Sequence, residues 1–122
     1  MKKILVIDDD LTFVAMIKAA LDPKAYTVSS AANGEEGLSA MEESTPDLIL
    51  LDVMMPKMDG IEFLKQMNKK YGEGKTPVLI TSNISSMDKI SEGVALGIKG
   101  YFVKSDESLQ GIIGMIDRVF QK

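Results

Sequence analysis

Three aspartates, a serine and a lysine stand where short apolar runs of this sequence end. Asp8 and Asp9 follow the first run, and Asp52 follows the most apolar one. Ser82 and Lys104 follow two later runs, so a hydroxyl and an ammonium group have the same placement. Carboxylates that lie close together repel one another and raise one another's pKa unless cations neutralise them. These residues therefore predict a divalent-cation site if the folded chain brings them together.

A metal site in this chain must be built from oxygen atoms, because the sequence contains no histidine and no cysteine. Mg2+ prefers a few carboxylates, several waters and a phosphate oxygen, and Mn2+ and Ca2+ also accept oxygen ligands. Phosphoryl transfer requires an in-line nucleophile and cations around the phosphoryl oxygens. An ionised carboxylate is such a nucleophile without a general base. The residues thus favour phosphoryl transfer to Asp52 with Mg2+, with Lys104 binding the phosphoryl oxygens and Ser82 donating to one of them.

Composition narrows the class of protein. The 122 residues fit one domain, 1–122, and the hydrophobic fraction of 45% is what a packed core requires. A net charge of −4 argues against direct binding to nucleic acid. We expect neither a signal peptide nor a membrane span, because the apolar runs are too short. A chain without cysteine suits the cytoplasm, where we expect this protein to act.

The elements that must position these residues alternate between short apolar runs and helical stripes. A segment with helical periodicity follows each of five predicted strands, at 2–7, 26–31, 48–51, 78–81 and 100–103. This alternation predicts an α/β fold, in which five helices flank a doubly wound, five-stranded parallel sheet. Ligands of such sheets bind at the carboxyl ends of the strands, where the polar residues named above are predicted to meet.

Caps and apolar stripes predict where the helices lie. Asp10 is expected to cap the first helix, and Asn33 the second. The fourth helix has the weaker stripe, which consists of Met87, Ile90 and Val94. The last helix has the clearest stripe, which consists of Leu109, Ile112, Ile113, Ile116, Val119 and Phe120.

Four segments resemble the receiver domains of two-component response regulators, including single-domain chemotaxis and sporulation regulators. They are Ile-Leu-Val-Ile-Asp-Asp-Asp at 4–10, Asp-Leu-Ile-Leu-Leu-Asp-Val-Met-Met-Pro-Lys-Met-Asp-Gly at 47–60, Thr-Pro-Val-Leu-Ile-Thr-Ser at 76–82 and Gly-Tyr-Phe-Val-Lys at 100–104. Together they are highly specific, and the resemblance covers the whole chain. It implies a flavodoxin-like fold with the strand order 2-1-3-4-5, which chemotaxis receivers have.

The resemblance implies a phosphoacceptor aspartate and a metal site. Asp52 is then the residue that is phosphorylated, in a two-component or phosphorelay pathway. Asp9 binds Mg2+ directly, and Asp8 acts mainly through metal-bound water. Asp52 and the backbone carbonyl of Met54 complete the implied set of protein ligands.

The resemblance also implies a switch made of a hydroxyl and an aromatic residue. Thr81 and Ser82 both follow the fourth strand, but Ser82 lies 30 residues after Asp52 and 22 before Lys104, which is the family's usual spacing. We therefore assign the hydroxyl to Ser82. Tyr101 matches the aromatic side chain that swings inward as the hydroxyl moves toward the phosphoryl group, and we expect it to be half-buried in packing.

Three departures from the family pattern surround the site. Asn83 stands where a small residue is usual, which puts the phosphorylation rate in doubt. Ser105 replaces the proline that follows the lysine, so a cis peptide is not assured there. Met54 and Ile84 are apolar at the positions that flank the site, and we expect them to exclude water and to slow hydrolysis of the phosphoryl group.

The resemblance implies that a sensor histidine kinase or a histidine phosphotransfer protein supplies the phosphoryl group. A homodimer through the fourth helix, fifth strand and last helix is a further expectation. An aspartyl-phosphate phosphatase of the haloacid dehalogenase kind is disfavoured, because the position of its second acid is Met54. A degenerate receiver that only docks is disfavoured by the intact site residues. We therefore predict no enzyme, apart from self-catalysed phosphorylation from small donors and self-dephosphorylation.

Overall fold

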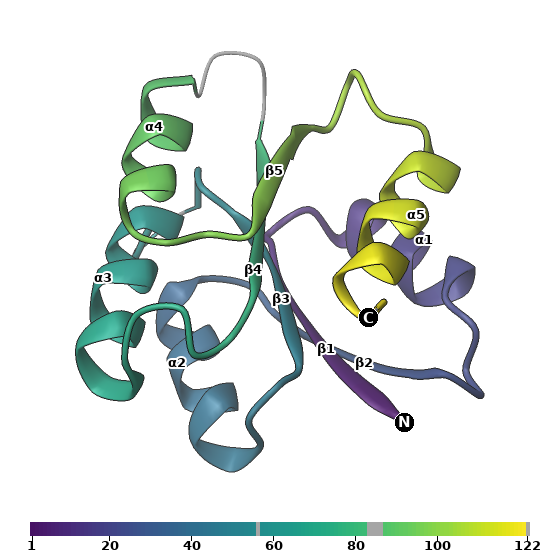
Figure 1. Cartoon of the computed structure of the whole chain (residues 1–122), viewed down its shortest axis with the longest axis horizontal. Helices are drawn as coiled ribbons and strands as arrows, with labels where there is room; N and C mark the ends of the chain where they lie inside the picture. Colours follow the sequence, from purple (N-terminus) through teal and green to yellow (C-terminus); the bar gives the residue numbers. More distant parts are fainter. Residues whose placement is uncertain (56, 83–86, 122) are drawn as a thin grey trace.

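The structure is a computed structural model, and it describes residues 1–55, 57–82 and 87–121 (Figure 1). Strands and helices alternate strictly along this part of the chain. They are β1 (Lys2–Ile7), α1 (Leu11–Ala20), β2 (Tyr26–Ala31), α2 (Gly34–Glu43), β3 (Leu48–Asp52), α3 (Gly60–Tyr71), β4 (Val78–Ser82), α4 (Met87–Ala95), β5 (Gly100–Val103) and α5 (Leu109–Val119).

The five strands form one parallel sheet with the order β2-β1-β3-β4-β5. The predicted doubly wound, flavodoxin-like α/β fold is therefore confirmed. Helices α1 and α5 cover one face of the sheet, and α2, α3 and α4 cover the other (Figure 1). β3 lies at the centre of the sheet, and every residue of this strand is buried, as its apolar sequence predicted.

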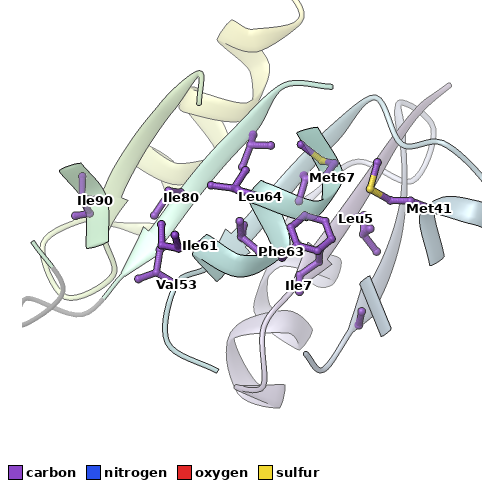
Figure 2. Packing of buried hydrophobic residues seen from close by; sticks show 14 residues of the cluster. Leu5, Ile7, Met41, Val53, Ile61, Phe63, Leu64, Met67, Ile80 and Ile90 are labelled. Carbon is purple, nitrogen blue, oxygen red and sulfur yellow. The ribbon is translucent and has the colours of Figure 1, made fainter. Parts of the chain in front are cut away.

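Side chains that alternate along the strands divide the core into two halves. Leu48 and Leu50 of β3 pack with α1 and α5, whereas Ile49 and Leu51 pack with the other three helices. Figure 2 shows this second half, where Phe63 of α3 lies over the sheet. The polar residues at the strand ends thus belong to a sheet that is covered by helices on both faces.

Two strands extend one residue further than the sequence predicted. Asp52 still pairs with Thr81 of the neighbouring strand, and Ser82 pairs with Val103. Both polar residues therefore belong to the sheet, which holds their backbones in place at the edge where the site lies.

Capping residues begin the helices where they were predicted to do so. The side chain of Asp10 accepts hydrogen bonds from the backbone N–H groups of Thr12 and Phe13, and the side chain of Asn33 accepts one from Glu36. Because Asp10 caps α1 directly after Asp8 and Asp9, this helix begins beside the predicted site.

Gly60 allows α3 to begin against the end of β3. A Cβ atom on Gly60 would lie only 2.4 Å from the carbonyl oxygen of Asp52. The N–H of Gly60 donates to the carbonyl of Val53 at 3.1 Å. This close approach fixes the backbone that directly follows Asp52.

The stripe predicted for α4 was wrong at one position. Ile90 is buried against the sheet, but Val94 is 56% exposed, because the packed face of α4 runs through Ile90 and Gly93 instead. The peptide between Lys104 and Ser105 is trans. The predictions made for Asn83 and Ile84 fall outside the described residues. No helix among the residues that the structure covers combines the length and the apolar character needed to cross a membrane.

Candidate functional site

The three predicted carboxylates meet at the carboxyl ends of β1 and β3. One oxygen atom from each of Asp8, Asp9 and Asp52 lies within 4.8 Å of the others. Asp8 is 1% exposed and Asp52 is 6% exposed, whereas Asp9 faces solvent. The cluster therefore has two buried acids and one open side, through which an ion and a phosphate could enter.

Asp8 has an oxygen atom that the protein does not fully satisfy. Its Oδ1 accepts a hydrogen bond from the N–H of Asp10 at 2.9 Å. Its Oδ2 forms an ion pair with Lys104 Nζ at 2.7 Å, and no group within the described residues donates a hydrogen bond to this buried atom. A buried carboxylate oxygen without a hydrogen-bond donor fits a hard divalent cation.

Burial and the charge of Asp8 together raise the pKa of Asp52 from 3.8 to about 7. Asp9 raises it slightly further, while the N–H of Met54 and the ammonium of Lys104 lower it by less. Without a bound cation, Asp52 therefore keeps its proton to a higher pH than an ordinary carboxyl group does. A divalent cation would favour the ionised form, which is the nucleophilic one.

Lys104 reaches the cluster from the far side of β3 and β4. Its N–H donates to the carbonyl of Ser82 at 2.9 Å. Its side chain is 18% exposed and carries the ammonium group to Asp8. The sequence placed these residues at separate strand ends, and the fold brings them together.

Thr81 and Ser82 are adjacent hydroxyl residues on opposite faces of the sheet. Thr81 pairs with Asp52 in register, so alternation places its side chain on the face of α1 and α5. Ser82 then faces the side of α3 and α4, which it shares with Tyr101 of β5. Both hydroxyls are completely buried, and neither has a hydrogen-bond partner among the residues that the structure describes.

Comparisons with known proteins agree with this fold. A family model described as the response regulator receiver domain matches residues 4–114. The chain belongs to the response regulator receiver family.

Curated relatives of this receiver domain are longer proteins. It is 41% identical over 104 residues to the alkaline phosphatase synthesis transcriptional regulatory protein PhoP of Bacillus subtilis. This match covers 84% of this chain and 42% of that protein. It is 34% identical over 110 residues to the transcriptional regulatory protein YdfI of the same organism. This match covers 88% of this chain and 50% of that protein. The chain thus spans half or less of the length of these two relatives.

Solved structures of receiver proteins superpose over nearly the whole chain. The chemotaxis response regulator CheY4 of Vibrio cholerae has a TM-score of 0.86 at 32% identity, and the match covers 98% of this chain and 99% of that one. The receiver domain of the Francisella response regulator 1452 has a TM-score of 0.84 at 31% identity, with 98% and 96% covered.

Two side chains near the site of this receiver domain are partly exposed. Tyr101 was expected to be half-buried, and it is 46% exposed, so about half of its surface is covered. β5 is an edge strand, so its residues on this face are covered less than those of inner strands. Met54 is 52% exposed beside Asp52, and its N–H donates to Asp52 Oδ1 at 3.2 Å.

Phe13 is a residue of the site that the sequence analysis missed. Its ring centroid lies 4.5 Å from Lys104 Nζ. The spacing from the cap at Asp10 could have placed Phe13 on the sheet-facing side of α1. Nothing in the sequence, however, indicates that a lysine more than ninety residues later reaches this ring.

Proposed function

We propose that residues 1–122 form one receiver domain that works as a phosphoacceptor switch in a two-component or phosphorelay pathway. Asp52 accepts a phosphoryl group from a phosphohistidine on a sensor histidine kinase or a histidine phosphotransfer protein. The observation that carries this proposal is the meeting of Asp8, Asp9 and Asp52 with the ammonium of Lys104 at one edge of the sheet. Family membership supports the same function.

The proposed reaction is a direct displacement at phosphorus. An ionised oxygen of Asp52 attacks the phosphorus atom, a P–O bond forms, and the P–N bond to the donor's imidazole breaks. The imidazole leaves with the bonding electron pair and takes up a proton from solvent. No general base is required, because the attacking carboxylate carries no proton.

Asp8, Asp9, Asp52 and the backbone carbonyl of Met54 are the residues that would hold Mg2+, and Mn2+ could take its place. The bound ion would neutralise the carboxylates and polarise the phosphoryl oxygens. The three carboxylates that meet at one point support this assignment, because a hard divalent cation prefers oxygen ligands and would neutralise their charges. Lys104 would bind a second phosphoryl oxygen, and the free hydroxyl of Ser82 would donate to another.

Phosphorylation would act on the surface of α4, β5 and α5 through Ser82 and Tyr101. The phosphoryl group carries a charge of about −1.5 to −2 and replaces the single negative charge of the ionised Asp52 carboxylate. Ser82 and Tyr101 share one face of the sheet, and the partly exposed ring of Tyr101 would turn inward when Ser82 moves toward the phosphoryl group. The output that we propose is partner binding or homodimerisation on that surface. We propose that the domain acts in the cytoplasm and makes no direct contact with nucleic acid.

Acetyl phosphate with Mg2+ tests the proposal. Intact mass spectrometry should show the addition of one phosphoryl group per chain, and Asp52→Asn and EDTA should each abolish it. Release of many equivalents of phosphate from phosphate esters would instead indicate a phosphatase. An unchanged mass in the presence of Mg2+ would indicate a module that only docks.

A further inference from the structure

Phe13 of α1 contacts the lysine of the site, although the proposed function gives it no role. Its ring centroid is 4.5 Å from Lys104 Nζ. Phe13 is 7% exposed and belongs to the core between the sheet and helices α1 and α5. The face of an aromatic ring is partially negative and attracts an ammonium group at this distance. Lys104 therefore has two attractive neighbours, the carboxylate of Asp8 and this ring.

The backbone at Lys104 does little to fix the position of the ammonium group. Lys104 and Ser105 lie in a turn, which a hydrogen bond from the N–H of Asp106 to the carbonyl of Val103 closes at 3.0 Å. The lysine side chain is a flexible four-carbon stem. The contacts made at the end of this stem must therefore decide where the ammonium group lies.

The contact with Asp8 is the one that a bound cation would weaken. Asp8 belongs to the carboxylate cluster, and a carboxylate that shares its charge with a divalent ion attracts an ammonium group less strongly. Phe13 has no ligand atom, and its ring stays packed in the core. The ring contact is thus independent of the state of the metal site.

We infer that Phe13 is a positioning residue, whose ring keeps Lys104 Nζ at the carboxylate cluster when a cation occupies that cluster. The ammonium group is then already in position when the phosphoryl oxygens bind. This inference rests on the proposed function, because it assumes that Lys104 binds a phosphoryl group on Asp52.

Two probes separate this role from a purely structural one: Mg2+ alone, and beryllofluoride with saturating Mg2+ as a mimic of the phosphoryl group on Asp52. Phe13→Leu removes the ring and keeps an apolar side chain. We expect the affinity for beryllofluoride to fall about five- to tenfold and the affinity for Mg2+ alone to change by less than about twofold. The rate of phosphorylation by acetyl phosphate should fall together with the affinity for beryllofluoride.

Three matched variants serve as controls. Phe13→Tyr keeps the ring and should bring the affinity for beryllofluoride back to within about twofold of the original. Phe63→Leu makes the same change in the core on the opposite face of the sheet, where the ring is completely buried, and should leave both affinities unchanged (Figure 2). In a Lys104→Ala background, Phe13→Leu should have no further effect.

Equal beryllofluoride affinities for the original chain and Phe13→Leu would overturn the inference. An equal loss in Phe63→Leu, or no recovery in Phe13→Tyr, would do so as well. Circular dichroism shows whether Phe13→Leu folds, and Phe13→Met replaces it as the ring-free variant if it does not. An original chain that binds no beryllofluoride would contradict the proposed function itself, whereas binding that is insensitive to the ring would contradict only the role of Phe13.

Discussion

Asp52 is buried beside another carboxylate, and both features disfavour its ionised form. Its pKa of about 7 in the folded chain exceeds its ordinary value of 3.8, so between these values the folded state holds a proton that the unfolded state releases. The stability that this proton contributes is fully present below about pH 4 and is lost as the pH rises through 7. Without divalent cations, ionised Asp52 therefore destabilises the fold above neutral pH.

Asp52→Asn should stabilise the metal-free protein in a pH-dependent way. In EDTA at pH 8 we expect the free energy of unfolding to rise by about 2 kcal/mol, because the buried charge is gone. At pH 5 folded Asp52 is mostly protonated, but Asp52 of the unfolded chain, with its ordinary pKa of 3.8, is already ionised, so the gain should be less than half of that at pH 8. Urea denaturation at both pH values measures the difference, and an equal gain at the two would contradict the raised pKa.

The two adjacent hydroxyls should respond differently to removal. Thr81→Val deletes a buried hydroxyl that has no partner and keeps the shape of the side chain, so the protein should gain about 1 kcal/mol of stability with little change in phosphorylation rate. Ser82→Ala should instead slow phosphorylation by acetyl phosphate and abolish any change in Tyr101 fluorescence. The opposite pattern would show that Thr81 is the functional hydroxyl.

The sequence predicted which polar residues belong to the site, but not the contacts that their side chains make. The sequence placed Asp8, Asp9, Asp52, Ser82 and Lys104 at strand ends, and alternation with helices made a parallel sheet the expected way to bring them together. The contact of Lys104 with Phe13, the unpaired hydroxyls and the exposed ring of Tyr101 depend on side-chain packing between distant segments, which local periodicity does not report.

At the scale of elements, the junction of β3 and α3 is the part that fixes Asp52. Gly60→Ala places a Cβ against the carbonyl oxygen of Asp52, and a shift of backbone is needed to relieve the contact. We expect a loss of about 2 kcal/mol in unfolding free energy and slower phosphorylation. Gly114→Ala in α5 is the control, because its Cβ meets only the far end of Arg118 at 3.9 Å, and it should add up to about 1 kcal/mol. An unchanged stability for Gly60→Ala would contradict the importance of this close approach.

Element boundaries followed the sequence wherever a cap or an apolar run marked them. The caps at Asp10 and Asn33 were predicted because short polar side chains satisfy the free N–H groups of a helix start. Asp52 and Ser82 were left out of their strands because both are polar, yet each still pairs across the sheet. Val94 was assigned to the apolar stripe of α4 from its spacing alone. The sequence does not indicate which residues of that helix are buried in the folded protein.

At the scale of the whole molecule, the metal site should couple ion binding to the stability of the fold. A ligand that binds only the folded state raises its stability according to the logarithm of its concentration over its dissociation constant. We expect roughly 10 mM Mg2+ to raise the Tm clearly at pH 8. At pH 5.5 the rise should be much smaller, because Asp52 must lose its proton before it can bind the ion. Differential scanning calorimetry measures both shifts, with Asp52→Asn as the control. A larger shift at the lower pH would contradict the proposed ligand set.

The central claim is that the carboxylate of residue 52 itself carries the phosphoryl group. After treatment with acetyl phosphate and Mg2+, borohydride reduces an acyl phosphate to an alcohol, so tandem mass spectrometry should find homoserine at position 52 and nowhere else. The same treatment in EDTA should leave aspartate there. Homoserine at another acidic residue, or none in the Mg2+ sample despite a folded protein, would contradict the claim.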